Sequence, residues 1–227
     1  MGKAKRVLFA PLDWGLGHAT RCMPLIDRAM ALGHTPVIAA SGRGGDLLRA
    51  HYPQLEHHDF PGVDIKYGKN AAFDTLRLGP DLIRGVQQEQ QLLEALVSRL
   101  QIDLVLSDNR YGAWSKMVPS VFMSHQLSPK PPRGLQFTRP LLQLLLRYWL
   151  RPFKYLLVPD LPHAFTSLAG ELSHAWHDKR LRYLGPLSRL EAVATGQGAH
   201  RLLVILSGPE PQRTGLMATS TLPQIAV

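Results

Sequence analysis

Short apolar runs alternate with stretches of helical spacing along most of the chain. The runs predict buried strands at residues 6–11, 35–40, 102–107, 120–124 and 155–159, and weaker strands at 55–60 and 181–184. Apolar residues at helical periods predict helices at residues 19–32, 46–51, 80–100 and 135–150. Strands that alternate with helices are typical of βαβ units, so the sequence predicts an α/β fold with a Rossmann-like parallel sheet.

A polar stretch at residues 188–200 interrupts this pattern and indicates a linker. It separates a domain at residues 1–187 from a fresh apolar strand at 201–207. A buried parallel strand needs neighbours on both sides, yet residues 215–227 show neither a helical stripe nor a convincing strand. We therefore expect residues 201–227 to be the truncated start of a second Rossmann-like domain.

The composition and the charge favour a folded protein with an anionic partner. Hydrophobic residues make up 45% of the chain, which supplies a core and argues against overall disorder. The formal net charge of +9 favours a phosphorylated substrate, nucleic acid or an acidic membrane surface. The alternative is that the charge serves solubility alone.

The cysteine content and the apolar stretches indicate the cellular compartment of the protein. Cys22 is the single cysteine, so no intrachain disulfide can form and a reducing compartment is favoured. Residues 7–12 are too short for a signal-peptide core, and basic side chains interrupt residues 141–157, so we expect a cytoplasmic protein. Arg147 and Arg151 among apolar neighbours indicate either a peripheral membrane contact or a buried helix with basic ends.

A glycine loop with Gly15, Gly17 and His18 follows the first strand, and residues 15–18 are expected to form a tight turn. Glycine lets the backbone approach a ligand closely, and the free amides at the start of the next helix attract an anion. A histidine titrates near neutral pH, so His18 can take a proton from a hydroxyl group. The alternatives are a turn without a ligand and a histidine that only packs or caps the helix.

Polar side chains also follow two later strands. Asp108, Asn109 and Arg110 follow the third buried strand, and His125 follows the next one. Because ligands bind at the carboxyl ends of strands in open parallel sheets, these residues are candidates to line one site. Asn109 and Arg110 suit hydrogen bonds to a sugar or a phosphate. The alternative is a polar loop that caps the next helix.

Two further signals are weaker. Ser207 and Gly208 end the strand at residues 201–207, where a Ser–Gly turn can meet a diphosphate or form a plain loop. The pair His57 and His58 lacks other ligands at metal-binding spacing, so no metal site is predicted.

Taken together, these segments resemble the GT-B glycosyltransferases related to the peptidoglycan N-acetylglucosaminyltransferase, and most of all an uncharacterised bacterial branch of that group. The likeness covers residues 5–214 and is carried by residues 10–21, 107–112, 124–127, 183–189 and 206–214. It implies two Rossmann-like domains that face each other across a cleft. The N-terminal domain would hold the acceptor, and the C-terminal domain would hold the nucleotide-sugar donor.

The resemblance also implies roles for residues of the N-terminal domain. Gly15, Gly17 and His18 match the family's acceptor loop. His18 would be the best candidate for the general base, or for a residue that positions the acceptor. Asp108 and His125 would line the cleft as rival bases.

In the second domain, Ser207 and Gly208 match the first loop of the donor domain. Family members commonly need no metal, because helix dipoles and side chains stabilise the leaving diphosphate. The resemblance therefore implies a nucleotide-sugar as donor substrate and no metal or other cofactor.

The leading interpretation is transfer of a hexosyl or N-acetylhexosaminyl group from a nucleotide-sugar to a hydroxyl of a membrane-linked or otherwise anionic acceptor. With its donor domain incomplete, the chain alone is expected to lack turnover. One alternative is a sugar-nucleotide epimerase of the same architecture, which takes no acceptor. Another is a non-catalytic fragment that binds a glycolipid or an anionic surface. Nucleic-acid binding is disfavoured, because the aromatic and basic residues form no recognisable binding module.

Overall fold

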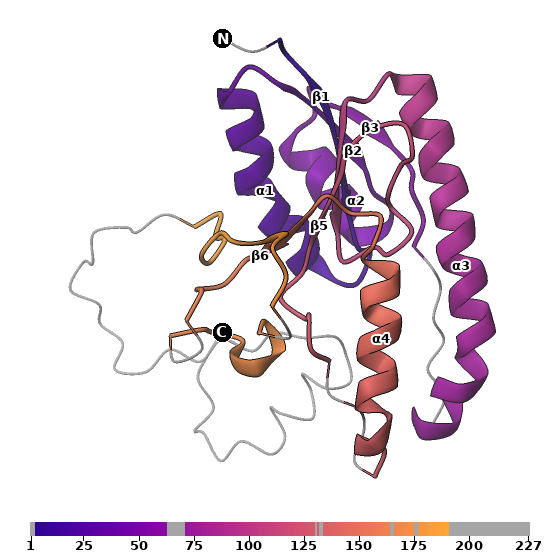
Figure 1. Ribbon diagram of the computed structural model, residues 1–227. Coiled ribbons are helices and arrows are strands. Elements are labelled where there is room, and N and C mark those ends of the chain that lie inside the picture. Colours follow the sequence, from indigo (N-terminus) through magenta and orange to yellow (C-terminus); the bar gives the residue numbers. More distant parts are fainter. Residues whose placement is uncertain are drawn as a thin grey trace, which may run out of the picture. The chain divides into compact units, whose positions relative to one another are not determined.

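The computed structural model describes residues 3–62, 71–129, 131, 134–163, 166–174 and 177–190, without the side chains of residues 71–81. Within these ranges seven strands form one sheet, and every neighbouring pair is parallel (Figure 1). The strands are β1 (Arg6–Pro11), β2 (Thr35–Ala39), β3 (Glu56–His58), β4 (Leu104–Asp108), β5 (Ser120–Met123), β6 (Tyr155–Val158) and β7 (Leu181–Tyr183). Their order across the sheet is β3-β2-β1-β4-β5-β6-β7. The predicted Rossmann-like α/β sheet is confirmed.

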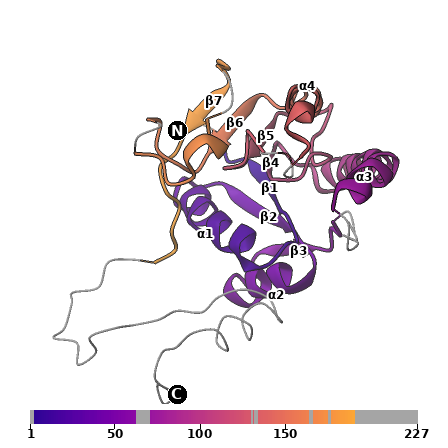
Figure 2. The same ribbon diagram turned by 90° about the horizontal axis from the view of Figure 1, so that it is seen from below.

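Helices cover both faces of this sheet. The described helices are α1 (Leu16–Ala31), α2 (Gly42–His51), α3 (Ala71–Leu100) and α4 (Arg139–Trp149), with short 3₁₀ turns η1 (Gln136–Thr138) and η2 (Gly170–Leu172). Figure 2 shows α1 and α2 on one side of the sheet and α3 and α4 on the other. Two helical layers around a parallel sheet leave only the ends of the strands open to a ligand.

Each face has its own apolar core, because alternate strand residues point to opposite faces. Under α1 and α2 the core includes Phe9, Ile38, Leu106 and Met123 from the strands. Under α3 it includes Leu8, Val37 and Val105, and under α4 it includes Phe122, Leu156 and Val158. Strands that are buried on both faces explain the continuous apolar runs of the sequence.

The beginning of α1 differs from the prediction. The helix was expected to start at residue 19 after a turn at residues 15–18, but it starts at Leu16. Gly15 adopts a left-handed backbone (φ 72°) and acts as the N-cap. Such a φ suits glycine, and it lets the chain enter the helix directly after the loop. Gly17 and His18 therefore lie in the first helical turn.

Other helices also begin earlier than predicted or are divided. α2 begins at Gly42 instead of residue 46, and α3 begins at Ala71 instead of residue 80. The predicted helix at residues 135–150 is divided into η1 and α4. Among the described helices, none is both long enough and apolar enough to cross a bilayer.

Residues Met1–Leu190 form one compact unit, and residues 191–227 lie outside the described residues. The predicted strand at residues 201–207 and the candidate donor-binding residues Ser207 and Gly208 lie outside the described residues.

Candidate functional site

The carboxyl ends of β1 and β4 meet where the strand order reverses. Pro11 and Asp108 are partners in register, and the Leu12 amide donates to the Asp108 carbonyl oxygen at 3.0 Å. Ligands of open α/β sheets bind in the crevice outside such a reversal point. The chain leaves β1 toward His18, and β4 ends at Asp108, so both predicted site residues come to this point.

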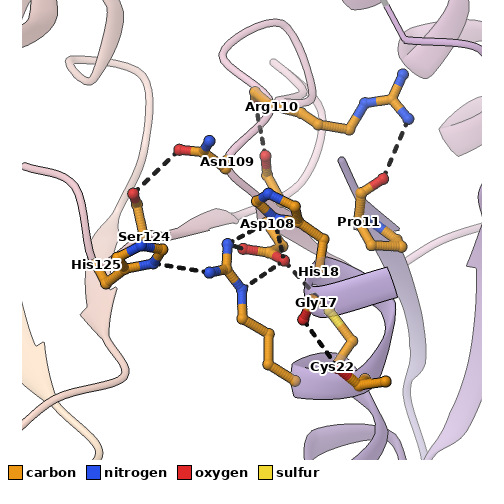
Figure 3. A network of polar contacts seen from close by, with 12 residues as sticks. Pro11, Gly17, His18, Cys22, Asp108, Asn109, Arg110, Ser124 and His125 are labelled. Atoms are coloured by element: carbon orange, nitrogen blue, oxygen red, sulfur yellow. Dashed lines mark hydrogen bonds and ion pairs between the residues drawn. The ribbon is translucent and has the colours of Figure 1, made fainter. Parts of the chain in front are cut away.

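His18 and Asp108 form a pair at this reversal point (Figure 3). The Nδ1 atom of His18 lies 3.0 Å from Oδ2 of Asp108. The Asp108 side chain is completely buried, whereas 14% of the His18 side chain is exposed. A carboxylate beside one imidazole nitrogen orients the ring and leaves the other nitrogen for a substrate.

Arg21, one helical turn after His18, connects this pair to His125. Its Nε donates to Oδ2 of Asp108 at 2.8 Å, and its Nη2 contacts Oδ1 of the same carboxylate. Two parallel bonds of this kind are typical of strong arginine–carboxylate pairs. Nη2 also lies 2.7 Å from Nδ1 of His18, and Nη1 lies 2.8 Å from Nδ1 of His125. We call His18, Arg21, Asp108 and His125 the histidine cluster.

Burial and charge shift the pKa of two groups around the cluster. Burial, and then the positive charges of Arg21 and His18, lower the pKa of His125 below its ordinary value. Cys22 is buried with its Sγ 3.9 Å from Oδ2 of Asp108, and burial raises the pKa of its thiol well above the usual range. Near pH 7, His125 is therefore neutral and Cys22 remains a thiol.

The glycine loop beside the cluster is open. A Cβ atom built on Gly15 or Gly17 would meet no atom within 4 Å. Trp14 and Leu16 next to these glycines are 47% and 42% exposed. The first backbone amides of α1 have no partner within the helix, and no acidic residue lies in its first turn. The loop therefore offers a free approach and amide donors to an acceptor.

Asn109 supports the loop that carries His125. Its backbone is left-handed (φ 59°), and its amide donates to the carbonyl oxygen of Met123 at 2.9 Å. The Ser124 hydroxyl donates to Oδ1 of Asn109 at 3.0 Å, as Figure 3 shows. Asn109 thus joins the chain after β4 to the chain after β5. Its predicted contact with a ligand stays a prediction.

Arg110 does not have the predicted role of a substrate-binding residue. Its side chain is completely buried, and its Nε donates to Oε1 of Glu89 at 2.7 Å. Its other nitrogens donate to the carbonyl oxygens of Phe60 at 2.8 Å and Pro61 at 2.6 Å. The guanidinium also stacks on the Phe60 ring, 3.9 Å from its centroid. All of these partners belong to the protein, so Arg110 joins β4 to α3 and to the segment after β3.

Arg21 was not predicted as a site residue from the sequence. It stands three positions after His18, and this spacing places two side chains on one face of a helix. The signal was hidden because the helix was predicted to start after His18. A helix start at Leu16 would have joined His18 and Arg21 on one surface.

His57 and His58, which lie in β3, each have a partner close by in the sequence. His57 Nε2 lies 2.8 Å from the carbonyl oxygen of Tyr52, and His58 Nε2 lies 2.8 Å from Oε1 of Glu56. In the described ranges no group of three or more His, Cys, Asp or Glu side chains is placed to hold a metal ion. In the histidine cluster itself, the fixed charge of Arg21 opposes a cation.

Comparison with known proteins places the chain beside glycosyltransferases, although no family model matches it. It is 30% identical over 166 residues to an uncharacterized glycosyltransferase of Methanosarcina acetivorans, a match that covers 67% of this chain and 41% of that protein. It is 25% identical over 206 residues to an uncharacterized glycosyltransferase of Methanosarcina mazei, covering 85% of this chain and 54% of that protein. The chain thus spans about half the length of the curated relatives that it matches.

A solved structure shares the fold. The calicheamicin glycosyltransferase CalG4 superposes with a TM-score of 0.53 at 18% identity, over 82% of this chain and 53% of that one. The predicted branch, related to the peptidoglycan N-acetylglucosaminyltransferase, stays a prediction. The chain has the Rossmann-like fold of GT-B glycosyltransferases and resembles glycosyltransferases in sequence over most of its length.

Proposed function

We propose that this chain acts in glycosyl transfer, and that the histidine cluster binds and deprotonates the hydroxyl acceptor. The observation that carries the proposal is the contact of 3.0 Å between Nδ1 of His18 and the buried carboxylate of Asp108. It lies at the strand-order reversal, beside a glycine loop with open space around it. A nucleophile-activating pair and a place for a substrate therefore occur together.

His18 is the base in this proposal. With Nδ1 directed at Asp108, the Nε2 lone pair can take the proton of the acceptor hydroxyl. The hydroxyl oxygen then attacks the anomeric carbon of the donor, and the bond from that carbon to the diphosphate oxygen breaks. The nucleotide diphosphate leaves with the electron pair. A positioned base of this kind contributes about 10²–10⁴-fold to such a step.

Asp108 has a positioning role, because its side chain has no exposed surface from which to reach an acceptor. It orients His18 and stabilises the imidazolium that forms when the proton moves. Arg21 holds the carboxylate through two nitrogens. This arrangement places a fixed positive charge against the buried carboxylate.

The donor remains part of the proposal. The similarity to glycosyltransferases supports a nucleotide-sugar. The family resemblance of the sequence implies that Ser207 and Gly208 belong to its binding loop. Both residues lie outside the described ranges. Transfer without a metal ion is likewise proposed, with helix amides and basic side chains to stabilise the leaving diphosphate.

An anionic membrane surface is the second proposed partner. Residues 109–159 contain eight Lys and Arg and no Asp or Glu. Within them, α4 carries an exposed apolar stripe beside basic side chains, which we call the α4 surface. It is made of Leu141, Leu144, Leu145, Arg147, Tyr148 and Arg151. Apolar side chains next to a basic, acid-free segment suit a helix that lies on acidic lipids.

The catalytic proposal is tested by product analysis. The purified protein is incubated with a panel of nucleotide-sugars and hydroxyl acceptors, and the products are identified by mass spectrometry. Because the chain spans about half the length of its relatives, the assay uses a full-length version that includes a donor domain. In that version we expect transfer by the wild type, a loss of about 10²–10⁴-fold in His18→Ala, and no change in His51→Ala at the exposed end of α2. Undiminished transfer by His18→Ala would remove this base. Epimerised nucleotide-sugar formed without an acceptor would support the epimerase alternative.

The membrane proposal has a separate test. We expect the wild type to sediment with vesicles of anionic lipid and to stay in solution with vesicles of neutral lipid. Replacement of Leu141 and Leu144 by Ser is expected to weaken this binding. The matched control is Leu92→Ser on α3, because Leu92 is 49% exposed and lies outside the α4 surface. Equal binding to neutral and anionic vesicles would contradict the proposal.

A further inference from the structure

We propose that Arg21 is a positioning residue that fixes the tautomer of His125, and that Asp108 fixes His18 in the opposite tautomer. In this arrangement His18 accepts a proton through Nε2, whereas His125 donates a hydrogen bond through Nε2. The two histidines therefore have different roles, although they stand at the same edge of the sheet.

The tautomer of His125 follows from its contact with Arg21. An arginine side chain has only donors, so Nη1, 2.8 Å from Nδ1 of His125, donates a hydrogen bond to that nitrogen. The Nδ1 atom must then present its lone pair. A neutral imidazole with a free lone pair on Nδ1 carries its hydrogen on Nε2. His125 is thereby made an N–H donor, and its Nε2 cannot take a proton from an acceptor.

The Nδ1 atom of His18 has two neighbours and can share a hydrogen bond with only one. One neighbour is Oδ2 of Asp108 at 3.0 Å, and the other is Nη2 of Arg21 at 2.7 Å. The carboxylate is buried and has no hydrogen, so a lone pair on Nδ1 would be repelled by it. Nη2 already donates to Oδ1 of Asp108. These contacts favour an Nδ1 hydrogen that is donated to Asp108, which leaves Nε2 as the free lone pair.

The charges that face His125 agree with a neutral ring. Arg21 and His18 approach from α1, Asp108 from the end of β4, and Asp160 from the segment after β6. Burial, then the charge of Arg21, and the charge of His18 whenever that ring is protonated, lower the pKa of His125, and the two carboxylates oppose this without reversing it. A protonated His125 would turn an N–H toward the guanidinium of Arg21. The geometry and the charges therefore both disfavour a protonated His125.

The consequence for the substrate rests on the proposed function. The hydroxyl proton of the acceptor moves to Nε2 of His18, and the Nε2 hydrogen of His125 is donated to a second oxygen of the acceptor. Because both rings contact one guanidinium group, one acceptor molecule can reach both. The cluster thus selects acceptors that carry a second oxygen near the reacting hydroxyl, as sugar rings do. His125, a rival base in the sequence analysis, becomes a substrate-binding donor.

The tautomers can be measured without any substrate. We would label the full chain with ¹⁵N-histidine and record long-range ¹H–¹⁵N spectra at neutral pH. His18→Gln and His125→Gln would assign the two rings among the ten histidines of the chain. We expect His125 with its hydrogen on Nε2 and His18 with its hydrogen on Nδ1. The opposite form at either ring would overturn the proposal.

Two arginine variants test the role of Arg21. Arg21→Lys keeps a positive charge beside Asp108 but removes the planar fork that reaches both rings. We expect the His125 signals to move toward a mixture of tautomers in this variant. Arg28→Lys, exposed on the same helix, is expected to leave both rings unchanged. Unchanged His125 signals in a folded Arg21→Lys chain would exclude Arg21 as the residue that fixes them.

Transfer assays then separate the two histidines. Gln keeps an N–H donor but has no basic nitrogen. His125→Gln is therefore expected to keep kcat/KM within about tenfold of the wild type, whereas His18→Gln loses about 10²–10⁴-fold. Equal losses would overturn the donor role of His125. Correct tautomers in this chain, together with no sugar transfer by a full-length version that includes a donor domain, would support the inference about Arg21 and contradict the proposed function.

Discussion

Two buried arginine–carboxylate pairs meet the ends of the central strands, and they differ in what else the arginine contacts. Arg110 pairs with Glu89, and its remaining nitrogens donate to backbone carbonyl oxygens. Arg21 pairs with Asp108, and its remaining contacts are with two imidazole rings. The Arg110 side chain has no exposed surface, whereas 13% of the Arg21 side chain is exposed.

This difference separates a structural pair from a candidate reactive one. Each nitrogen of the first guanidinium donates to a group of the protein, and the side chain has no exposed surface at which a ligand could bind. In the second pair the partners are histidines, whose ring nitrogens can accept a proton or donate a hydrogen bond. Burial of an ion pair is therefore a poor sign of function by itself. The sign of function is a titratable partner that keeps some access to solvent.

The largest expected effect comes from breaking the structural pair. Glu89→Ala leaves the Arg110 charge buried without a counter-ion, which costs about 3–5 kcal/mol of unfolding free energy. Urea unfolding followed by circular dichroism would measure the loss. The control is Asp46→Ala, because Asp46 is 76% exposed, and we expect it to change stability by less than about 0.5 kcal/mol. A Glu89→Ala loss below that of the control would contradict the structural role.

Removal of the buried carboxylate of the histidine cluster should lower the free energy of unfolding by less. Asp108→Ala also removes a buried carboxylate, but Arg21 is partly exposed and can turn its guanidinium toward water. We expect a loss of about 1–3 kcal/mol, smaller than that of Glu89→Ala under the same conditions. An Asp108→Ala chain that is less stable than Glu89→Ala would contradict the claim that the Arg21–Asp108 pair contributes less to stability.

Two glycines extend the comparison to the backbone. A Cβ at Gly112 would overlap the Val86 carbonyl oxygen and lie 2.7 Å from Cβ of Glu89, whereas a Cβ at Gly17 meets nothing within 4 Å. Gly112→Ala is therefore expected to cost about 1–3 kcal/mol through overpacking. Gly17→Ala, in a helical turn, is expected to leave stability equal or raise it by up to about 1 kcal/mol. Thermal unfolding of both variants would check this, and a destabilised Gly17→Ala would contradict the open loop.

The sequence could predict the sheet and the place of the site, because both depend on local patterns. Apolar runs marked the strands, and polar residues after them marked the carboxyl edge, where His18, Asp108 and His125 do meet. The direction of individual side chains could not be predicted from the sequence. Asn109 adopts a left-handed backbone, and the side chain after it, Arg110, turns away from the edge toward Glu89.

Arg21 shows the second reason why part of the site was missed. Its role depends on where α1 begins, and that point is set by the backbone of Gly15. No periodicity in the sequence reports whether a glycine loop closes before or after His18. A shift of three residues at a helix end was enough to conceal the residue that joins the cluster.

The smallest expected effect is a pH dependence of stability that comes from His125. Its pKa is lowered in the folded chain, so below about pH 6.5 the unfolded chain binds a proton that the folded chain does not. The contribution of His125 is complete above that pH and is lost as the pH falls toward the lowered folded value. Urea unfolding at several pH values between about 5 and 7.5 should show a steeper loss in the wild type than in His125→Gln. Parallel curves would mean that Arg21 and burial do not hold this ring neutral.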